Sequence, residues 1–171
     1  MKLLEKFYIL FCKAFKKKNA NDYPATFYRG ISDSGGVNGK YLTEAAFRFD
    51  EKGHNPERTD NKRELSINWN DNPNSLDVLL NQHKPGKTNF QFSVGYTEVY
   101  LEELHNAFKC QIKNGDLSYE RRPIMANPSK DVAENPYHGN LLINGDLDKL
   151  VVKTIQCALA SIASARLTLR N

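Results

Sequence analysis

The chain has 171 residues, of which 40% are hydrophobic and 26% charged, and its formal net charge is +4. This length and composition indicate one globular domain with a buried core and exclude a fibrous or disordered protein. Residues 1–18 contain six lysines and one glutamate, so the rest of the chain carries 18 basic against 19 acidic residues, which argues against a nucleic-acid-binding surface on the main fold.

Residues 1–21 form a separate basic arm in our interpretation. Within residues 2–17, apolar and aromatic side chains recur at helical spacing on one face, and lysines occupy the other. The segment is too short to span a bilayer and lacks the cleavage pattern of a signal peptide. Three roles stay open: packing on the domain's own core, docking in the groove of a partner protein, or contact of residues 1–18 with an anionic membrane surface.

Four segments of the body, residues 22–171, carry strand signals. They are residues 26–31, 64–70, 89–96 and 138–143, and residues 110–119 add a hairpin around Asn114-Gly115. The clearest pattern is the alternation of Leu65, Ile67 and Trp69 with polar residues, which predicts a half-buried strand. Residues 41–49 fit a helix or a strand, and residues 50–63 predict a loop.

Helical spacing of apolar residues marks three further segments. They are a short helix after Ser75, one over residues 98–108, and the longest over residues 146–168. In the longest, helical phase predicts a core face that holds Leu147, Leu150, Val151, Ile155, Ala158, Leu159, Ile162 and Ala163. We therefore predict an α+β fold: a mixed or antiparallel sheet of about five strands, packed by a long C-terminal helix and joined to the N-terminal amphipathic helix.

The cysteines and histidines follow no metal-binding pattern. Cys12, Cys110 and Cys157 lie far apart and are odd in number, so we predict three buried thiols in a reducing compartment. None of the 4 histidines stands at the spacing of a helical metal site, and the chain has no glycine-rich phosphate loop. We expect neither a metal nor a cofactor.

Four polar residues are candidates for ligand binding: Arg29, Ser66, Asn135 and His138. Arg29 lies inside an apolar strand, where a guanidinium is costly unless it is paired or faces an anion. Ser66 lies on the polar face of the clearest strand, and the turn at Asn135-Pro136 delivers the titratable His138. Each has a structural alternative: an ion-paired arginine, a solvated serine, or a histidine that ties a loop to a strand. In one shared cavity they would bind a small anion, with Arg29 and His138 as catalytic candidates.

Five short motifs occur in a fixed order along the chain. They are Phe27-Tyr28-Arg29, Ala45-Ala46-Phe47, Leu65-Ser66-Ile67, Phe92-Ser93-Val94 and Asn135-Pro136-Tyr137-His138. This ordered set resembles a family of uncharacterised bacterial proteins, and the resemblance implies no particular activity. The first motif, with Gly30 after it, is also similar to the first-strand arginine motif of ADP-ribosyltransferases, where the arginine holds the dinucleotide. This chain has neither the Ser-Thr-Ser nor the late Glu-x-Glu of that family.

These observations lead to two hypotheses of function. The first is an intracellular bacterial binding module that recognises a partner protein or a small anionic ligand. It is favoured because the sequence contains an amphipathic arm but no complete catalytic motif. The alternative is an enzyme, either a divergent ADP-ribosyl or NAD-processing protein or a metal-independent nuclease, that uses Arg29 and His138. We expect a cytoplasmic location, with attachment to the surface of the inner membrane as the alternative.

Overall fold

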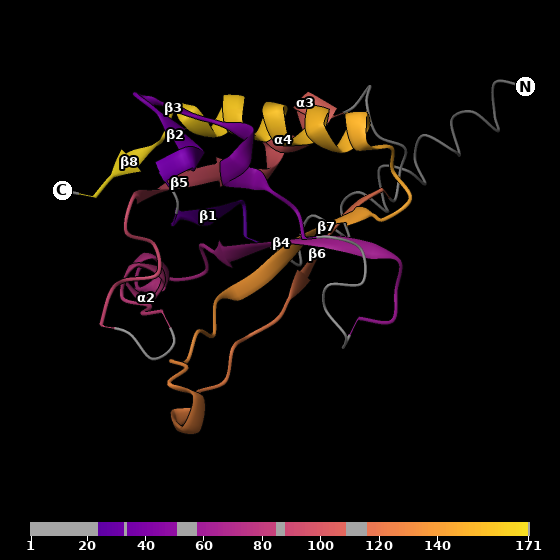
Figure 1. The fold of residues 1–171 in the computed structure, drawn as a ribbon. Coiled ribbons are helices and arrows are strands. Elements are labelled where there is room, and N and C mark those ends of the chain that lie inside the picture. Colours follow the sequence, from indigo (N-terminus) through magenta and orange to yellow (C-terminus); the bar gives the residue numbers. More distant parts are fainter. Residues whose placement is uncertain (1–23, 33, 51–57, 85–87, 109–115, 171) are drawn as a thin grey trace, which may run out of the picture.

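Six strands form one antiparallel sheet in the computed structural model, which describes residues 24–32, 34–50, 58–84, 88–108 and 116–170. The strands are β1 (Thr26–Ile31), β4 (Lys62–Trp69), β5 (Gly95–Tyr100), β6 (Leu117–Arg121), β7 (His138–Asn144) and β8 (Thr168–Leu169). Their order across the sheet is β6-β7-β4-β1-β5-β8 (Figure 1). The predicted α+β class is confirmed, and the sheet is antiparallel throughout.

The main core lies between the sheet and the long helix α4 (Lys149–Ser164). Strand alternation sends every second side chain toward this helix. The strand residues of the core are Phe27, Ile31, Leu65, Ile67, Trp69, Val99, Leu141 and Ile143. Each large apolar side chain that is removed from water stabilises the fold by roughly 1.5–3 kcal/mol. The alternation that the sequence shows in β4 therefore sets which face of the sheet is covered.

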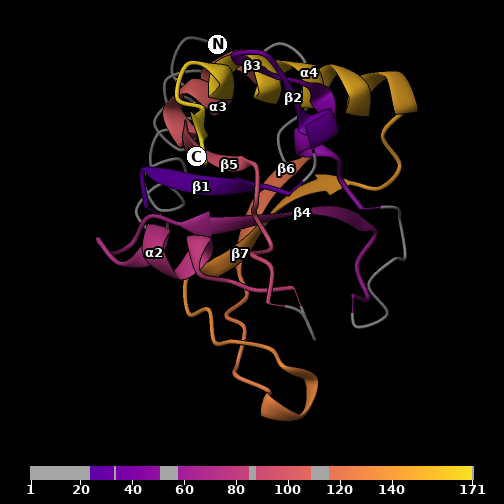
Figure 2. The same ribbon diagram turned by 60° about the vertical axis from the view of Figure 1, so that its left-hand side comes forward.

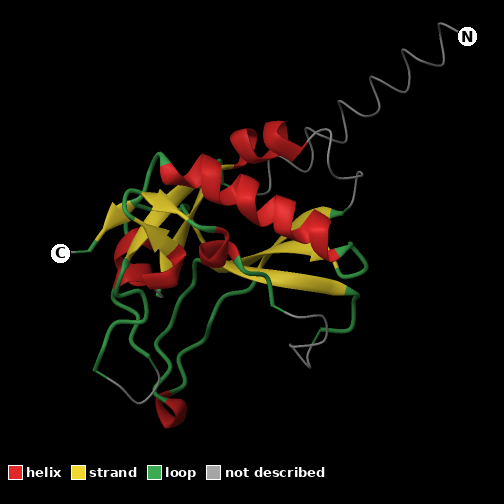
Figure 3. Ribbon diagram, turned by 45° about the horizontal axis from the view of Figure 1, so that its top comes forward, coloured by secondary structure: helices red, strands yellow, loops and turns green. Residues whose placement is uncertain are grey.

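One face of the sheet carries a layer of helices and a small hairpin. Figures 1 and 2 show α4 and α3 (Leu101–Phe108) on this side, and Figure 3 shows α4 crossing over the strands. The short helix η2 (Glu44–Phe47) and the pair β2 (Val37–Asn38) and β3 (Tyr41–Leu42) lie beside α4. The last turns of α4 are fastened at two points, because the Ala163 carbonyl accepts a hydrogen bond from Thr97 at 2.6 Å and the Ser164 hydroxyl accepts one from the Leu42 amide at 2.9 Å.

The opposite face is covered only in part. Helix α2 (Ser75–Leu80) packs there against β1 and β4. Beyond β6 and β7 the chain continues as a narrow extension, held by the isolated bridges Ile124↔Asn135 and Asn127↔Val132 and ending in the short helix η3 (Pro128–Lys130) (Figure 2). The centre of this face, over β4, β7 and β6, carries polar side chains, among them Ser66, Asn140 and Glu120.

The boundary between a predicted strand and a predicted helix is displaced. We predicted a strand over residues 89–96 and a helix over 98–108, but β5 comprises Gly95–Tyr100 and α3 begins at Leu101. Residues 89–94 therefore lie outside the strand that was predicted for them. The buried Thr97 and Val99 pair with Arg29 and Phe27 of β1, and this pairing keeps the segment extended. Residues 41–49 divide into strand β3 and helix η2.

The orientation of α4 about its axis also differs from the prediction. Leu150 and Cys157 were expected in the core, but Leu150 is 73% exposed and Cys157 is also exposed. The buried residues of α4 are Val152, Ile155, Leu159, Ala160 and Ala163. Positions 150 and 157 are separated by seven residues, which places them on one face of the helix, here the outer face.

Some predictions fall outside the residues that the structure describes. They concern the arm at 1–21, the Asn114-Gly115 turn, and the burial of Cys12 and Cys110. Within the described ranges, no helix combines the length and the apolarity needed to cross a bilayer.

Candidate functional site

The turn that delivers His138 has the predicted form. The His138 amide donates to the Asn135 carbonyl at 3.3 Å, which closes a four-residue turn with Pro136 at its second position. The Asn135 side chain is committed within the protein: its Oδ1 accepts from the Tyr137 amide at 3.1 Å, and its Nδ2 donates to Asn68 Oδ1 at 2.8 Å. Asn135 is only 1% exposed. Its role is therefore to hold the turn against β4.

His138 begins β7 and is half-buried. Its Nδ1 lies 2.8 Å from the carbonyl oxygen of Arg122. A carbonyl only accepts, so Nδ1 carries the proton in this bond. Burial lowers the pKa of His138 below its usual value and outweighs the hydrogen bond to the Arg122 carbonyl, which acts in the opposite direction. The imidazole is therefore neutral at physiological pH, with Nε2 as its acceptor atom.

Arg29 lies on the core-facing side of β1, in phase with Phe27 and Ile31. Its Nε donates to the Ala46 carbonyl of η2 at 3.1 Å, and its Nη1 donates to the Ser66 carbonyl at 2.7 Å. The backbone pairing of β1 with β4 ends at Tyr28. The Arg29 side chain therefore connects the two strands just beyond the last backbone pair. Burial lowers the pKa of Arg29 to about 10, and the guanidinium stays charged near neutrality.

The structure brings Ser66 and His138 to one face of the sheet and Arg29 to the other. Ser66 is exposed and pairs with Asn140, and the next pair on this face is Asn68 with His138. Residues directly opposite in an antiparallel pair share a face. Arg29 instead reaches η2 on the helix-covered side. The guanidinium, alcohol and imidazole of the predicted cavity therefore do not meet, although Arg29 touches the backbone of Ser66.

An ionic cluster, which the sequence did not reveal, lies on the face that holds His138. Glu64 of β4 is 3.3 Å from Arg58 and 3.4 Å from Arg122, and Arg58 also pairs with Glu120 of β6. Asn140 of β7 donates to Glu64 at 2.6 Å and to Glu120 at 2.8 Å. Both carboxylates are thus engaged by arginines, and Arg58 connects β4 and β6, while Asn140 of β7 bonds to the same two carboxylates. The cluster therefore offers no free charge to a ligand.

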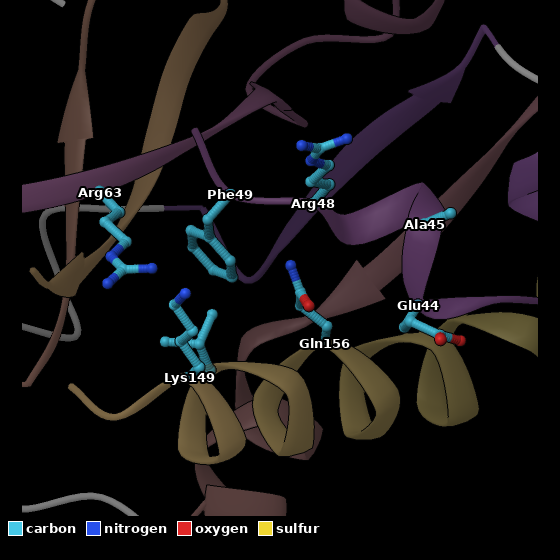
Figure 4. Close-up of a pocket in the computed structure, with 8 residues that line it drawn as sticks. Glu44, Ala45, Arg48, Phe49, Arg63, Lys149 and Gln156 are labelled. Carbon is cyan, nitrogen blue, oxygen red and sulfur yellow. The ribbon is translucent and has the colours of Figure 1, made fainter. Parts of the chain in front are cut away.

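A second polar region, the basic pocket, lies where β4 and the segment after η2 face the first turns of α4. Its volume is about 290 Å³, and it is lined by Glu44, Ala45, Arg48, Phe49, Arg63, Lys149, Val152 and Gln156. Figure 4 shows the Arg63 and Lys149 side chains extending toward one another beside the Phe49 ring. Three of the lining residues are cations and one is an anion, so the pocket carries an excess of positive charge.

The cations of the basic pocket have few partners. Arg63 Nη2 donates to the Gly145 carbonyl at 3.1 Å, but its Nε is buried without a hydrogen-bond partner. Among the described residues, none forms an ion pair with Arg48, Arg63 or Lys149, and the lining carboxylate, Glu44, is 3.7 Å from Lys153. Two facing cations and an unsatisfied charged donor are costly, and an anion between them would offset that cost.

Sequence reasoning missed this pocket, although one signal pointed to it. Arg63 stands in phase with Leu65, Ile67 and Trp69, so alternation alone places it at the end of the core-facing row of β4. Lys149 carries no comparable signal, because a single lysine in the first turn of a predicted helix is typical of a solvated surface position. In the described part of the chain, no group of three or more metal-ligating side chains is present. No family model, curated protein or solved structure matches the chain.

Proposed function

We propose that the protein is a binding module that takes a small anionic ligand in the basic pocket. The observation that carries the proposal is the convergence of Arg63 and Lys149 over Phe49 with no ion-pair partner among the described residues (Figure 4). Arginine and lysine are the side chains that proteins use most for phosphate and carboxylate groups. The anionic ligand predicted from Arg29, Ser66 and His138 is thus assigned to a different set of residues.

The size of the pocket supports a small ligand. Pockets that enclose drug-sized molecules measure roughly 300–1,000 Å³, and this one has about 290 Å³. A dinucleotide is too large to be enclosed here. The alternative of an NAD-processing enzyme or nuclease gains no support from geometry either, because Arg29 and His138 lie on opposite faces of the sheet and cannot contact one substrate together.

Calorimetric titration of inorganic phosphate into the full chain tests the proposal. Arg63→Gln and Lys149→Gln each remove one positive charge and keep most of the side-chain volume. A hydrogen bond to a charged group contributes about 1.5–3 kcal/mol, so each variant should bind phosphate about 10- to 100-fold more weakly than the wild type. Added sodium chloride should weaken binding further, because the contacts are electrostatic.

The matched control is Lys130→Gln. Lys130 is exposed in η3, at the tip of the extension on the other side of the sheet, and its removal changes the net charge by the same amount. This variant should bind phosphate about as well as the wild type. Absence of binding by the wild type, or equal binding by all four proteins, would contradict the proposed function. Circular dichroism checks that each variant is folded.

A further inference from the structure

Gln156 borders the basic pocket at the end away from Arg63 and Lys149. Lys149, Val152 and Gln156 are three and four residues apart on α4, so they share one face of the helix. Two turns, or about 10 Å of helix rise, separate the first from the last. Figure 4 shows the Gln156 amide directed from α4 into the space between the helix and the residues around η2. Figure 4 also shows Arg48 and Glu44 near Gln156, and their opposite charges offset one another. The pocket therefore has a cationic end at Arg63 and Lys149 and a polar end without net charge at Gln156.

The Gln156 amide is free to bind a ligand. The side chain is half-buried, and no hydrogen bond connects it to any group in the described part of the chain. A primary amide has two donors and one acceptor, so it pairs well with hydroxyl groups. A half-buried amide without a protein partner gains more from such a pairing than a fully solvated one does.

The floor between the two polar ends is apolar. Phe49 and Val152 line the pocket there, and both are buried. This surface suits a short carbon chain, which would cover it and displace water. A ligand that used the whole pocket would thus have an anionic group, a few carbon atoms and a hydrogen-bonding end.

We infer that the ligand is a phosphomonoester of a short polyhydroxylated carbon chain, and that Gln156 selects it through its hydroxyl groups. The inference rests on the anion-binding function proposed above. A phosphomonoester carries about −1.5 to −2 charge at neutral pH, which matches the two cations Arg63 and Lys149 better than a single carboxylate does. The carbon chain crosses Phe49 and Val152, and a hydroxyl meets the amide of Gln156.

Three probes separate the parts of this inference: inorganic phosphate, propyl phosphate and glycerol 3-phosphate. Propyl phosphate and glycerol 3-phosphate have the same number of carbon atoms and differ by two hydroxyl groups. Calorimetry on the full chain should give glycerol 3-phosphate the lowest dissociation constant. In Gln156→Leu it should bind about 3- to 10-fold more weakly, the effect of one neutral hydrogen bond, and the other two probes should bind as before.

The control variant is Cys157→Ala, the next residue on α4, which is exposed and does not line the basic pocket. It should bind all three probes as the wild type does. If phosphate binds through Arg63 and Lys149 but glycerol 3-phosphate binds no more tightly than propyl phosphate, the selective role of Gln156 is refuted and the anion site stands. If no probe binds the wild type, both proposals fail. Even if Gln156→Leu does not fold, a wild type that binds glycerol 3-phosphate no more tightly than propyl phosphate refutes the inference.

Discussion

Gly139 lies beneath the indole ring of Trp69. The Trp69 Nε1 donates to the Glu120 carbonyl at 3.4 Å, and a Cβ atom at position 139 would overlap both the indole nitrogen and that carbonyl. The absence of a side chain at Gly139 therefore lets the largest residue of the core close against β7. This explains why a glycine follows His138.

Gly139→Ala should lower the free energy of unfolding by about 1–3 kcal/mol, the usual cost of overpacking a core. Urea unfolding followed by tryptophan fluorescence measures it, since Trp69 is the single tryptophan of the chain. The near-ultraviolet dichroism of the indole should change as well. An unchanged urea midpoint would show that Trp69 and β6 can shift to accept the extra methyl group without loss of stability.

His138 makes the stability of the fold depend on pH. Burial lowers its pKa in the folded state, so the unfolded chain binds the proton more readily. This contribution to stability is full above the ordinary histidine pKa of about 6.5 and declines as the pH falls below it. His138→Asn keeps a donor for the Arg122 carbonyl and has no titrating group. Between pH 8 and pH 5 the urea midpoint of the wild type should therefore fall more than that of the variant. Equal losses would mean that His138 protonates without cost.

At the scale of the element, α4 supplies both the core and one wall of the basic pocket. Its N-cap is Asp148, whose Oδ1 accepts from the Leu150 amide at 2.7 Å. The cap fixes the backbone of the first helical turn, which includes Lys149. Because Lys149 lines the basic pocket, the hydrogen bond that starts the helix also positions one cation of the pocket.

Asp148→Ala should cost about 1 kcal/mol of stability, because the helix start loses its side-chain acceptor. Asp148→Asn, which retains an acceptor, should cost much less. Thermal unfolding followed at 222 nm measures both variants against the wild type. A similar loss in the two variants would point to the charge of Asp148 rather than to its hydrogen bond.

Elements were predicted best where the local pattern and the tertiary contacts agree. Strands β1 and β4 and the turn at Asn135-Pro136 lie where the sequence placed them. The end of β5 could not be predicted, because its partner, β1, is distant in the sequence. The helical period located α4 but not its rotation, since Leu150 is as apolar as its buried neighbours and only packing shows that it faces outward.

At the scale of the whole molecule, the fold class was predictable and the site was not. Alternating and helical patterns are local, so they identify strands and helices and hence an α+β fold. The basic pocket depends on Arg63 of β4 lying beside Lys149 of α4. These residues are far apart in the sequence, so no local sequence pattern predicts that they are close in space. The same holds for the separation of Arg29 from His138, which follows from the register of β1, β4 and β7.

The strand order has a consequence for synthesis of the chain. β4 lies between β1 and β7, but β7 follows it only after β5 and β6 have been made. A nascent chain on the ribosome therefore holds β4 with one unpaired edge until residues 138–144 emerge. Such an edge is a template for association with other chains, and ladders between distant segments close slowly. Chaperone contact during translation should thus concentrate on the interval between the emergence of β4 and that of β7.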